Sequence, residues 1–395
     1  MDHPKLTEPG AKDASGPGAE DAAPATLEPL GWDPGWAAAF APFDDARRRP
    51  ARVVAAHRDA WILATEAGDR DATVSGRLRH EALGPADLPA GGDWVAATVP
   101  SSALEPAVVH AVLPRRSAFA RSSGDGHRTG GARLSDEQVI AANVDVALLV
   151  SGLDGDFNLR RLERYLGVAY AGGTTPVVVL NKADVAGGDG EFAGYRTAAE
   201  AVAPGVEVRT ISARTGDGVA ALAADHLRPG RTAVVLGSSG VGKSTLVNAL
   251  LGRDHLRTAA VREDDAKGRH TTTHRELVRL PGGALLVDTP GIRSLGVAGA
   301  ADGLGAAFAD VEDLAAGCRF ADCRHEREPG CAVRAALDDG TLDEARFASH
   351  RKLEREAAHV ARSGDRLLRE AERKKWKAIS QASSRHMAAK YGMDR

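Results

Sequence analysis

The chain has 395 residues and a hydrophobic content of 43%, so we expect a folded protein with two or three domains, each large enough to bury a core. No run of about 18 apolar residues predicts a membrane-spanning helix, and the acidic, proline-containing N-terminus does not resemble a secretory signal. We therefore expect a cytoplasmic protein without a membrane partner. The net charge of −3 at pH 7 conceals opposite charges at the two ends of the chain.

An acidic segment opens the chain, with nine acidic and two basic side chains in residues 1–45. Residues 1–29 are rich in Pro, Gly and Ala and show no apolar periodicity, which is typical of disorder. Trp32, Trp36 and Phe40 follow and predict a short helix that packs on the next domain. We predict an acidic and largely disordered tail over residues 1–45.

Residues 46–121 predict a small β-barrel. Short strand patterns alternate with turns, at residues 52–56, 60–65, 73–78, 93–98 and 107–113. Five short strands within about 70 residues are typical of a closed OB-fold. Such barrels bind nucleic acid through basic and aromatic groups. The candidates here are Arg77, Arg79, Arg115, Arg116 and Arg121, and an ordinary surface position is the alternative for each.

A glycine-rich, basic linker over residues 122–135 precedes an α/β domain, predicted over residues 136–305. Buried-strand patterns at 144–151 and 176–180 alternate with helical patterns at 159–170 and 197–203. Such alternation predicts a parallel, doubly wound sheet.

A motif for base recognition follows the second of these strands, Asn181-Lys182-Ala183-Asp184. The Asp184 carboxylate can accept from both N1–H and N2–H₂ of guanine, whereas adenine offers no such pair. Lys182 can lie along the face of the base. Ser212 and Ala213 follow a further short strand and predict the loop whose backbone contacts the guanine O6.

The phosphate site is predicted after the apolar run 232–236, where the chain fits the pattern GxxxxGKS/T with Gly237-Ser238-Ser239-Gly240-Val241-Gly242-Lys243-Ser244-Thr245. Backbone N–H groups in such a strand-loop-helix turn wrap a polyphosphate. Lys243 can reach the β- and γ-phosphates, and the Ser244 hydroxyl can bind Mg²⁺. A chance glycine-rich turn is the alternative.

Two further segments predict a γ-phosphate sensor. Asp288-Thr289-Pro290-Gly291 closes an apolar run, so Asp288 can hold Mg²⁺ through water and the Gly291 N–H can contact the γ-phosphate. The polar stretch 253–270 predicts a switch loop, after which Thr272 binds Mg²⁺ and the γ-phosphate; the start of a β-strand is the alternative. The position of the water-orienting glutamine of Ras-like enzymes is Ile292, which cannot hydrogen-bond water.

These motifs together predict a GTPase, but the base motif precedes the phosphate loop. A parallel sheet can be cut and rejoined in this way because the termini of a domain often lie close together. We therefore predict a circularly permuted GTPase domain that binds GTP and GDP with Mg²⁺.

A metal site is predicted near the C-terminus, where all three cysteines lie in the pattern Cys318-x₄-Cys323-x-His325-x₅-Cys331. Three thiolates and one imidazole make a closed, structural Zn²⁺ site, and three cysteines cannot all pair in disulfides. Three reduced cysteines without a metal are the alternative. Helical patterns at 333–337 and 342–378 complete a predicted helical zinc-binding domain over residues 306–395. Its last 30 residues carry nine basic and three acidic side chains and can meet RNA phosphates or pack on another domain.

In combination these motifs resemble the ribosome small-subunit-dependent GTPase A (RsgA) family. The matching stretches are Ala141-Ala142-Asn143-Val144-Asp145, the two motifs at 181–184 and 237–244, Gly268-Arg269-His270-Thr271-Thr272-Thr273, the motif at 288–291 and the cysteine spacing, over about residues 47–378. The resemblance implies a GTPase that binds the small ribosomal subunit and its rRNA and assists late maturation. Hydrolysis would be stimulated by the subunit and would drive release.

The resemblance also implies that His270 is the catalytic group, because the family carries a histidine just before its threonine run. We expect a monomer. A nucleotide-gated RNA-binding scaffold with negligible turnover is the alternative function, and Ile292 would explain it. An enzyme that uses GTP to modify tRNA or to deliver a metal is a weaker alternative, because no further cysteine is present.

Overall fold

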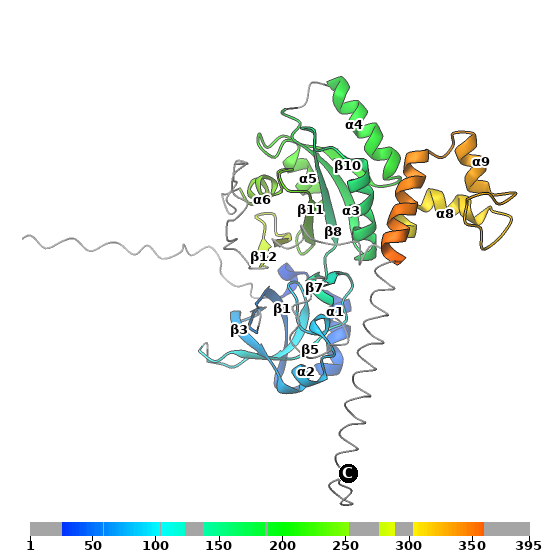
Figure 1. Ribbon diagram of the computed structural model, residues 1–395. Coiled ribbons are helices and arrows are strands. Elements are labelled where there is room, and N and C mark those ends of the chain that lie inside the picture. Colours follow the sequence, from blue (N-terminus) through cyan, green and yellow to red (C-terminus); the bar gives the residue numbers. More distant parts are fainter. Residues whose placement is uncertain are drawn as a thin grey trace, which may run out of the picture.

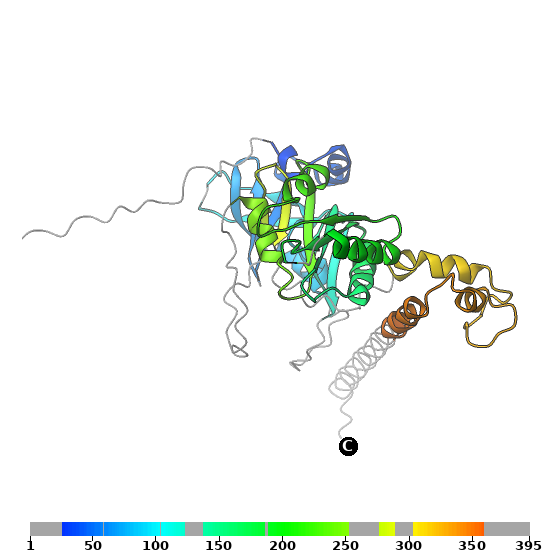
Figure 2. The same ribbon diagram turned by 90° about the horizontal axis from the view of Figure 1, so that it is seen from above.

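The computed structural model describes residues 26–57, 59–102, 104–122, 137–185, 189–252, 276–288 and 303–358. They form a β-barrel with a short N-terminal segment, an α/β domain next to the barrel, and a helical C-terminal domain on one side of the α/β domain (Figure 1). Seen from above, the C-terminal domain protrudes from the other two (Figure 2). The predicted combination of barrel, α/β domain and small helical domain is confirmed.

Five strands close the barrel in the order β1–β2–β3–β5–β4, with β4 paired back onto β1. Their bounds are β1 Arg48–Ala56, β2 Trp61–Thr65, β3 Gly68–Val74, β4 Trp94–Thr98 and β5 Ala107–Val112. The pair β3–β5 is parallel and the other pairs are antiparallel. Inward side chains such as Val53, Leu63 and Val109 are 0% exposed and fill the interior, so the barrel has a packed core and no channel.

The predicted strand at residues 73–78 is wrong over its second half. Strand β3 ends at Val74, and helix α2 (Gly76–Glu81) follows. The Ser75 hydroxyl accepts a hydrogen bond from the Leu78 N–H at 3.1 Å, which is the geometry of a helix N-cap. The helix cap at Ser75 therefore outweighs the alternation of apolar residues that predicted a strand. A short 3₁₀-helix, η3 (Pro85–Asp87), precedes β4.

The aromatic N-terminal segment is helical and packed, so the predicted disordered tail is too long at its C-terminal end. The segment contains η1 (Glu28–Leu30), α1 (Pro34–Phe40) and η2 (Ala41–Phe43). The Asp33 carboxylate caps α1 through the Trp36 N–H. The rings of Trp32 and Trp36 lie 4.8 and 6.2 Å from the ring of Trp94 in the barrel, and burying such side chains stabilises the segment by roughly 2 kcal/mol each. The first 25 residues lie outside the described part of the chain.

A two-stranded antiparallel ribbon connects the barrel to the α/β domain. It is formed by β6 (Ala118–Ser122) and β7 (Glu137–Ala142), which were not predicted. The predicted linker begins where β6 ends, and residues 123–136 lie outside the described residues.

Six strands form the sheet of the α/β domain in the order β10–β9–β8–β11–β13–β12. Their bounds are β8 Val146–Gly152, β9 Thr175–Asn181, β10 Glu207–Thr210, β11 Thr232–Gly237, β12 Glu276–Arg279 and β13 Leu285–Asp288. All neighbouring pairs are parallel except β12–β13. Strand β11 lies inside the sheet between β8 and β13, although β8, β9 and β10 precede it in the chain. This is the arrangement that circular permutation produces.

Helices cover both faces of this sheet. They are α3 (Leu159–Ala171) and α4 (Asp189–Val202) on one face and α5 (Val219–His226) and α6 (Lys243–Leu251) on the other. Alternate residues of a strand point to opposite faces. Accordingly Ala147 and Leu149 of β8 belong to the core with α3, whereas Leu148 and Val150 belong to the core with α5 and α6.

Among the described residues, four helices build the C-terminal domain. They are α7 (Leu304–Ala307), α8 (Ala309–Ala316), α9 (Ala332–Asp338) and a helix from residue 344 to the last described residue, 358. The two predicted helices of this domain are confirmed over the described residues. Among the helices of the described residues, none is long and apolar enough to cross a membrane.

Candidate functional site

The predicted base and phosphate motifs meet at one edge of the sheet. Strands β9, β8 and β11 are parallel neighbours, so their carboxyl ends lie together, where ligands bind in α/β folds. Asn181 ends β9 and Gly237 ends β11. The loop after β8 lies between them.

The phosphate loop connects β11 to α6 and is shaped by glycines. Gly242 has a φ of 94°, and a Cβ there would lie 2.3 Å from the Asn181 Nδ2 atom. A Cβ on Gly237 would lie 2.6 Å from the Val150 carbonyl oxygen. No other residue type fits such close approaches. Since α6 begins at Lys243, the free N–H groups of its first turn face the loop, as an anion site requires.

Lys243 bends back over the loop that precedes it. Its ammonium group donates to the Gly237 carbonyl at 2.8 Å and to the Ser238 carbonyl. Ser244 and Thr245 occupy the first turn of α6, directly after the loop. A hydroxyl in this place suits Mg²⁺, which prefers oxygen ligands.

Asn181 connects three motifs and is 1% exposed. Its Nδ2 donates to the Val241 carbonyl of the phosphate loop at 2.9 Å. Its Oδ1 accepts from the Ala213 N–H, also at 2.9 Å. The buried amide therefore fixes the positions of the base loop, the phosphate loop and the Ser212-Ala213 loop relative to one another.

Asp184 is held as a carboxylate by the loop that follows β10. Ser212 donates to one oxygen at 2.5 Å, and the Arg214 Nε donates to the other at 2.6 Å. The hydrogen bond from Ser212 is the largest of the effects that lower the pKa of Asp184. The Arg214 Nη2 lies 2.5 Å from the same oxygen as its Nε, so the N1–H and N2–H₂ groups of guanine would take acceptor positions of Asp184 that Arg214 occupies in this structure.

The loop after β8 supplies two residues that the sequence analysis missed. The Asp154 carboxylate accepts from the Lys182 ammonium, and the Asp156 carboxylate accepts from the Ser238 hydroxyl. The sequence could have indicated both aspartates, since polar residues that directly follow a buried strand lie at the ligand-binding edge of a parallel sheet. Which motif each aspartate contacts depends on the strand order, which the sequence does not show.

Several predicted residues lie outside the described part of the chain. They are His270, Thr272, Gly291 and Ile292. Asp288 ends β13, next to β11 in the sheet, and only its backbone is described. The strand order thus brings the backbone of residue 288 to the edge at which the phosphate loop lies.

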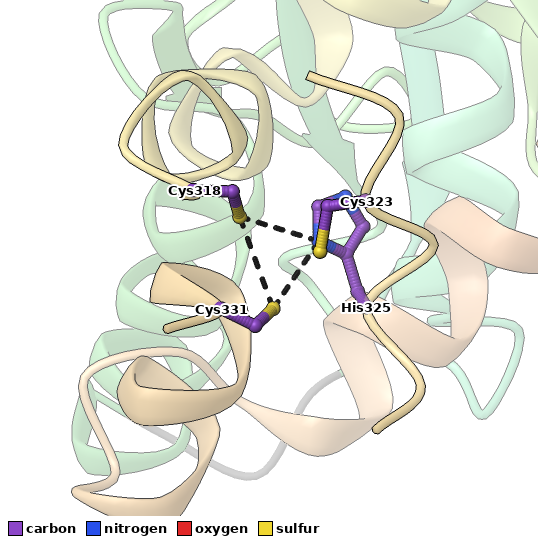
Figure 3. Close-up of side chains that lie close together, drawn as sticks. All are labelled: Cys318, Cys323, His325 and Cys331. Atoms are coloured by element: carbon purple, nitrogen blue, oxygen red, sulfur yellow. Dashed lines mark hydrogen bonds between the residues drawn. The ribbon is translucent and has the colours of Figure 1, made fainter. Parts of the chain in front are cut away.

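The four predicted metal ligands converge in the C-terminal domain (Figure 3). Their ligand atoms all lie within 4.8 Å of one another. The sulfurs of Cys318 and Cys331 are 3.8 Å apart, and the His325 Nδ1 lies 3.6 and 3.4 Å from them. A tetrahedral Zn²⁺ site with Zn–S of about 2.3 Å and Zn–N of about 2.0 Å has S–S edges of about 3.8 Å and S–N edges of about 3.5 Å. Donor set and spacing therefore fit Zn²⁺.

Local backbone features preorganise this cluster. Cys331 is the N-cap of α9, and the sulfur of Cys318 lies 3.8 Å from its sulfur. Burial opposes ionisation of Cys318, but the N–H groups of Val333 and Ala332 at the start of α9 help to lower the pKa of its thiol. His325 has a φ of 59°, a left-handed conformation that is uncommon outside glycine. Thiolate is the form that binds metal.

The barrel arginines divide into structural and exposed ones. Arg115 binds Asp93, which is 0% exposed, at 2.7 Å, and Arg116 binds Asp33 and stacks on the Trp36 ring at 4.1 Å. The side chain of Arg115 is 18% exposed, which favours the structural alternative for this residue, whereas the side chain of Arg116 is 50% exposed and stays a candidate. The side chains of Arg77 and Arg79 are 84% and 55% exposed, each beside one acid. The side chain of Arg121 is outside the described residues.

Comparisons with known proteins agree with this geometry. Residues 112–298 match the RsgA GTPase family. The chain is 50% identical over 365 residues to the small ribosomal subunit biogenesis GTPase RsgA of Opitutus terrae, covering 90% of this chain and 96% of that protein. It is 42% identical over 376 residues to the RsgA protein of Streptomyces avermitilis, covering 95% and 98%. This chain belongs to the RsgA GTPase family.

Solved structures show the same fold. The crystal structure of YjeQ from Thermotoga maritima matches with a TM-score of 0.57 at 24% identity, covering 79% of this chain and 99% of that one. YloQ, described as a circularly permuted GTPase, matches with a TM-score of 0.56 at 21% identity, covering 80% and 96%. The protein is thus a GTP hydrolase of the RsgA family with a circularly permuted GTPase domain. The site at the ends of β8, β9 and β11 is the candidate for its nucleotide site.

Proposed function

We propose that this GTPase acts in biogenesis of the small ribosomal subunit. It would bind the subunit and its rRNA in the GTP state, assist a late step of maturation, and leave after hydrolysis, which the subunit stimulates. The two relatives compared above, whose alignments cover 90% and 95% of this chain, are each named as a small ribosomal subunit biogenesis GTPase. No observation on the described residues favours the scaffold with negligible turnover.

The observation that carries the proposal is that the base and phosphate motifs meet in a domain that lies between two others. Asn181 links the base and phosphate loops within the site, while a barrel and a metal-cluster domain lie on different sides of it (Figure 1). A nucleotide domain between two others can change their relative position when its loops change state. RNA would be contacted through exposed basic groups such as Arg77 and Arg79.

We also propose the bound ions and the catalytic group. Cys318, Cys323, His325 and Cys331 would hold one Zn²⁺, which supplies stability and no chemistry because the protein fills all four ligand positions. Ser244 and Thr272 would bind the Mg²⁺ that accompanies GTP, with Asp288 acting through water. His270 would orient the attacking water, in place of the glutamine whose position Ile292 occupies. A cytoplasmic monomer fits this role.

The test is GTP hydrolysis by the purified chain alone and with small subunits, large subunits or bulk RNA, at fixed salt because phosphate contacts are salt-dependent. Stimulation by small subunits that is lost in Lys243→Ala is expected. His270→Ala should lower stimulated hydrolysis by about 10²-fold while GTP affinity is retained. Equal rates with all three additions would contradict the proposed ribosomal role.

A further inference from the structure

Asp156 contacts two parts of the domain at once. It lies between β8 and α3, two residues before the Asn158 N-cap of α3. One carboxylate oxygen accepts from the Ser238 hydroxyl in the phosphate loop, and the other accepts from Arg161 in α3 at 2.6 Å. Burial raises the pKa of Asp156, but these two bonds outweigh burial and lower it. Asp156 is therefore an anion that connects the phosphate loop to α3.

The contact is made at a residue whose backbone also binds Lys243. In this structure the Lys243 ammonium donates to the carbonyls of Gly237 and Ser238. An ammonium has three N–H donors, and a bound nucleotide would share them between these carbonyls and the β- and γ-phosphates. The backbone of Ser238 would then be held less strongly by Lys243 while Asp156 still holds its side chain. A displacement of Ser238 is thus transmitted to the N-terminus of α3.

The opposite side of α3 holds the C-terminal domain through a buried carboxylate. Glu163 is 0% exposed and accepts from Arg346 at 3.2 Å and from the Ser349 hydroxyl, both in the last described helix. Arg346 is 5% exposed and also binds Asp310 of α8 at 2.6 Å. Buried charges need all these partners, so the junction favours one position of the C-terminal domain relative to α3.

Backbone contact makes α3 and the C-terminal domain one rigid unit. A Cβ added to Gly303, directly before α7, would lie 2.1 Å from the Gly167 carbonyl oxygen and 2.4 Å from the Ala171 nitrogen. Both atoms belong to α3. The two backbones touch without any intervening side chain, so α7 cannot shift along α3 without a clash. Motion of α3 must carry the C-terminal domain with it.

We propose that Asp156 is a positioning residue that couples the nucleotide state of the phosphate loop to the position of the unit formed by α3 and the C-terminal domain. Ser238, Asp156 and Arg161 form the connection on the nucleotide side, and Glu163, Arg346 and Ser349 form it on the domain side. Because coupling is reciprocal, a change at the junction of α3 with the C-terminal domain should alter the relative affinities for GTP and GDP. The inference rests on GTP binding at this site and not on the ribosomal role.

The test is a double-mutant cycle on nucleotide affinity. Dissociation constants for a fluorescent GDP and a non-hydrolysable GTP analogue are measured for the full chain, Asp156→Asn, Ser349→Ala and the double variant. Asp156→Asn weakens a charge-assisted hydrogen bond and should change the GTP-to-GDP affinity ratio about tenfold. Ser349→Ala, which lies in another domain, should change this ratio about threefold to tenfold. When Asp156→Asn is already present, adding Ser349→Ala should change the GTP-to-GDP affinity ratio by less than about twofold.

The affinity ratio distinguishes coupling from loss of structure, because a merely destabilised site loses affinity for both nucleotides alike. Arg196→Ala is the matched control, since Arg196 pairs with exposed Glu200 on α4 at 2.7 Å and should leave the ratio unchanged. Arg346→Lys provides a second perturbation of the junction if Ser349→Ala is silent. An unchanged ratio in both junction variants, or an effect that persists undiminished without Asp156, would overturn the inference. If the inference fails while GTP still binds in the same assay, the proposed function is unaffected.

Discussion

At the scale of single residues, Asn181 joins the loops of the candidate nucleotide site. Replacing it with Ala leaves the Val241 carbonyl and the Ala213 N–H without their partners, at about 1–3 kcal/mol each. Asn181→Ala should therefore weaken GDP and GTP binding by roughly 10²-fold, measured by displacement of a fluorescent nucleotide. Affinity within threefold of the unmodified chain, with melting unchanged, would show that the loops hold their positions without this amide.

We expect the proposed contact of Asp184 with guanine to resist acid. Ser212 and Arg214 lower the pKa of this carboxyl, so the ionised form that guanine needs persists as the pH falls below the usual range of an aspartate, about 4. Recognition is present above the lowered pKa and is lost as the pH falls through it. In Ser212→Ala the largest lowering effect is gone, and GDP binding should be lost at a higher pH.

A titration of GDP binding between pH 7 and the onset of acid unfolding measures this shift. Circular dichroism of the same samples defines where the fold persists. Thr215→Ala is a suitable control, because the Thr215 hydroxyl accepts from the Asp217 N–H at 3.4 Å and is not among the donors to Asp184. Coincident titration curves for Ser212→Ala and the unmodified chain would refute the assigned role of Ser212.

The residue types of the site were readable from the sequence, but some of its contacts were not. Asn181, Asp184 and Lys243 sit in motifs whose spacing alone predicts their chemistry. Asp154 and Asp156 could be placed at the correct edge of the sheet, yet their partners Lys182 and Ser238 follow only from the order of the strands. The ligand spacing of the metal cluster was predictable because all four residues lie within one short segment.

At the scale of elements, the crossing of α7 and α3 depends on a single missing side chain. Gly303→Ala would place a methyl group against the Gly167 oxygen and the Ala171 nitrogen, and such overpacking costs about 1–3 kcal/mol. The control lies two residues further on, in α7 itself. A Cβ on Gly305 has its nearest neighbour at 4.0 Å, so Gly305→Ala should be neutral or stabilise the helix by up to about 1 kcal/mol.

Urea unfolding of both variants provides the comparison, with the C-terminal domain followed by hydrogen exchange in residues 344–358. Gly303→Ala should increase exchange in this helix, and Gly305→Ala should not. Equal behaviour of the two variants would mean that α7 can shift on α3, which would also weaken the rigid-unit step of the proposed coupling.

The elements that were predicted correctly are those whose residues repeat a strong local pattern. The apolar runs of β8 and β9 predicted buried parallel strands, since both faces of such a strand are covered. Helix α2 was missed because its start depends on one serine cap. Strands β6 and β7 were missed because they pair with each other across residues 123–136, so nothing in either strand alone identifies the partner.

At the scale of the whole molecule, one buried arginine joins three parts of the chain. Arg52 of β1 is 2% exposed and donates to the carbonyls of Leu30 and Gly92 and to the Thr232 hydroxyl. These groups belong to the N-terminal segment, the barrel and the α/β domain. Burial lowers the pKa of Arg52 to about 10, so the side chain is still a cation at neutral pH. No carboxylate binds it directly among the described residues, and neutral acceptors satisfy its fork of donors.

Arg52→Ala removes the guanidinium donor from these buried acceptors, of which the Gly92 carbonyl keeps its hydrogen bond from the Asn143 amide. The variant should lower the free energy of unfolding by roughly 3 kcal/mol, at about 1 kcal/mol for each lost partner. Arg49→Ala is the matched control on the same strand, since Arg49 is exposed and binds the Asp45 and Arg48 carbonyls, and it should change stability by less than about 0.5 kcal/mol. Arg52→Lys keeps the charge but not the fork, so its loss should be intermediate. Urea unfolding followed by tryptophan fluorescence reports on this junction directly, because the guanidinium lies 5.4 Å from the Trp94 ring. Equal midpoints for Arg52→Ala and Arg49→Ala would show that the three parts are held together by their apolar contacts alone.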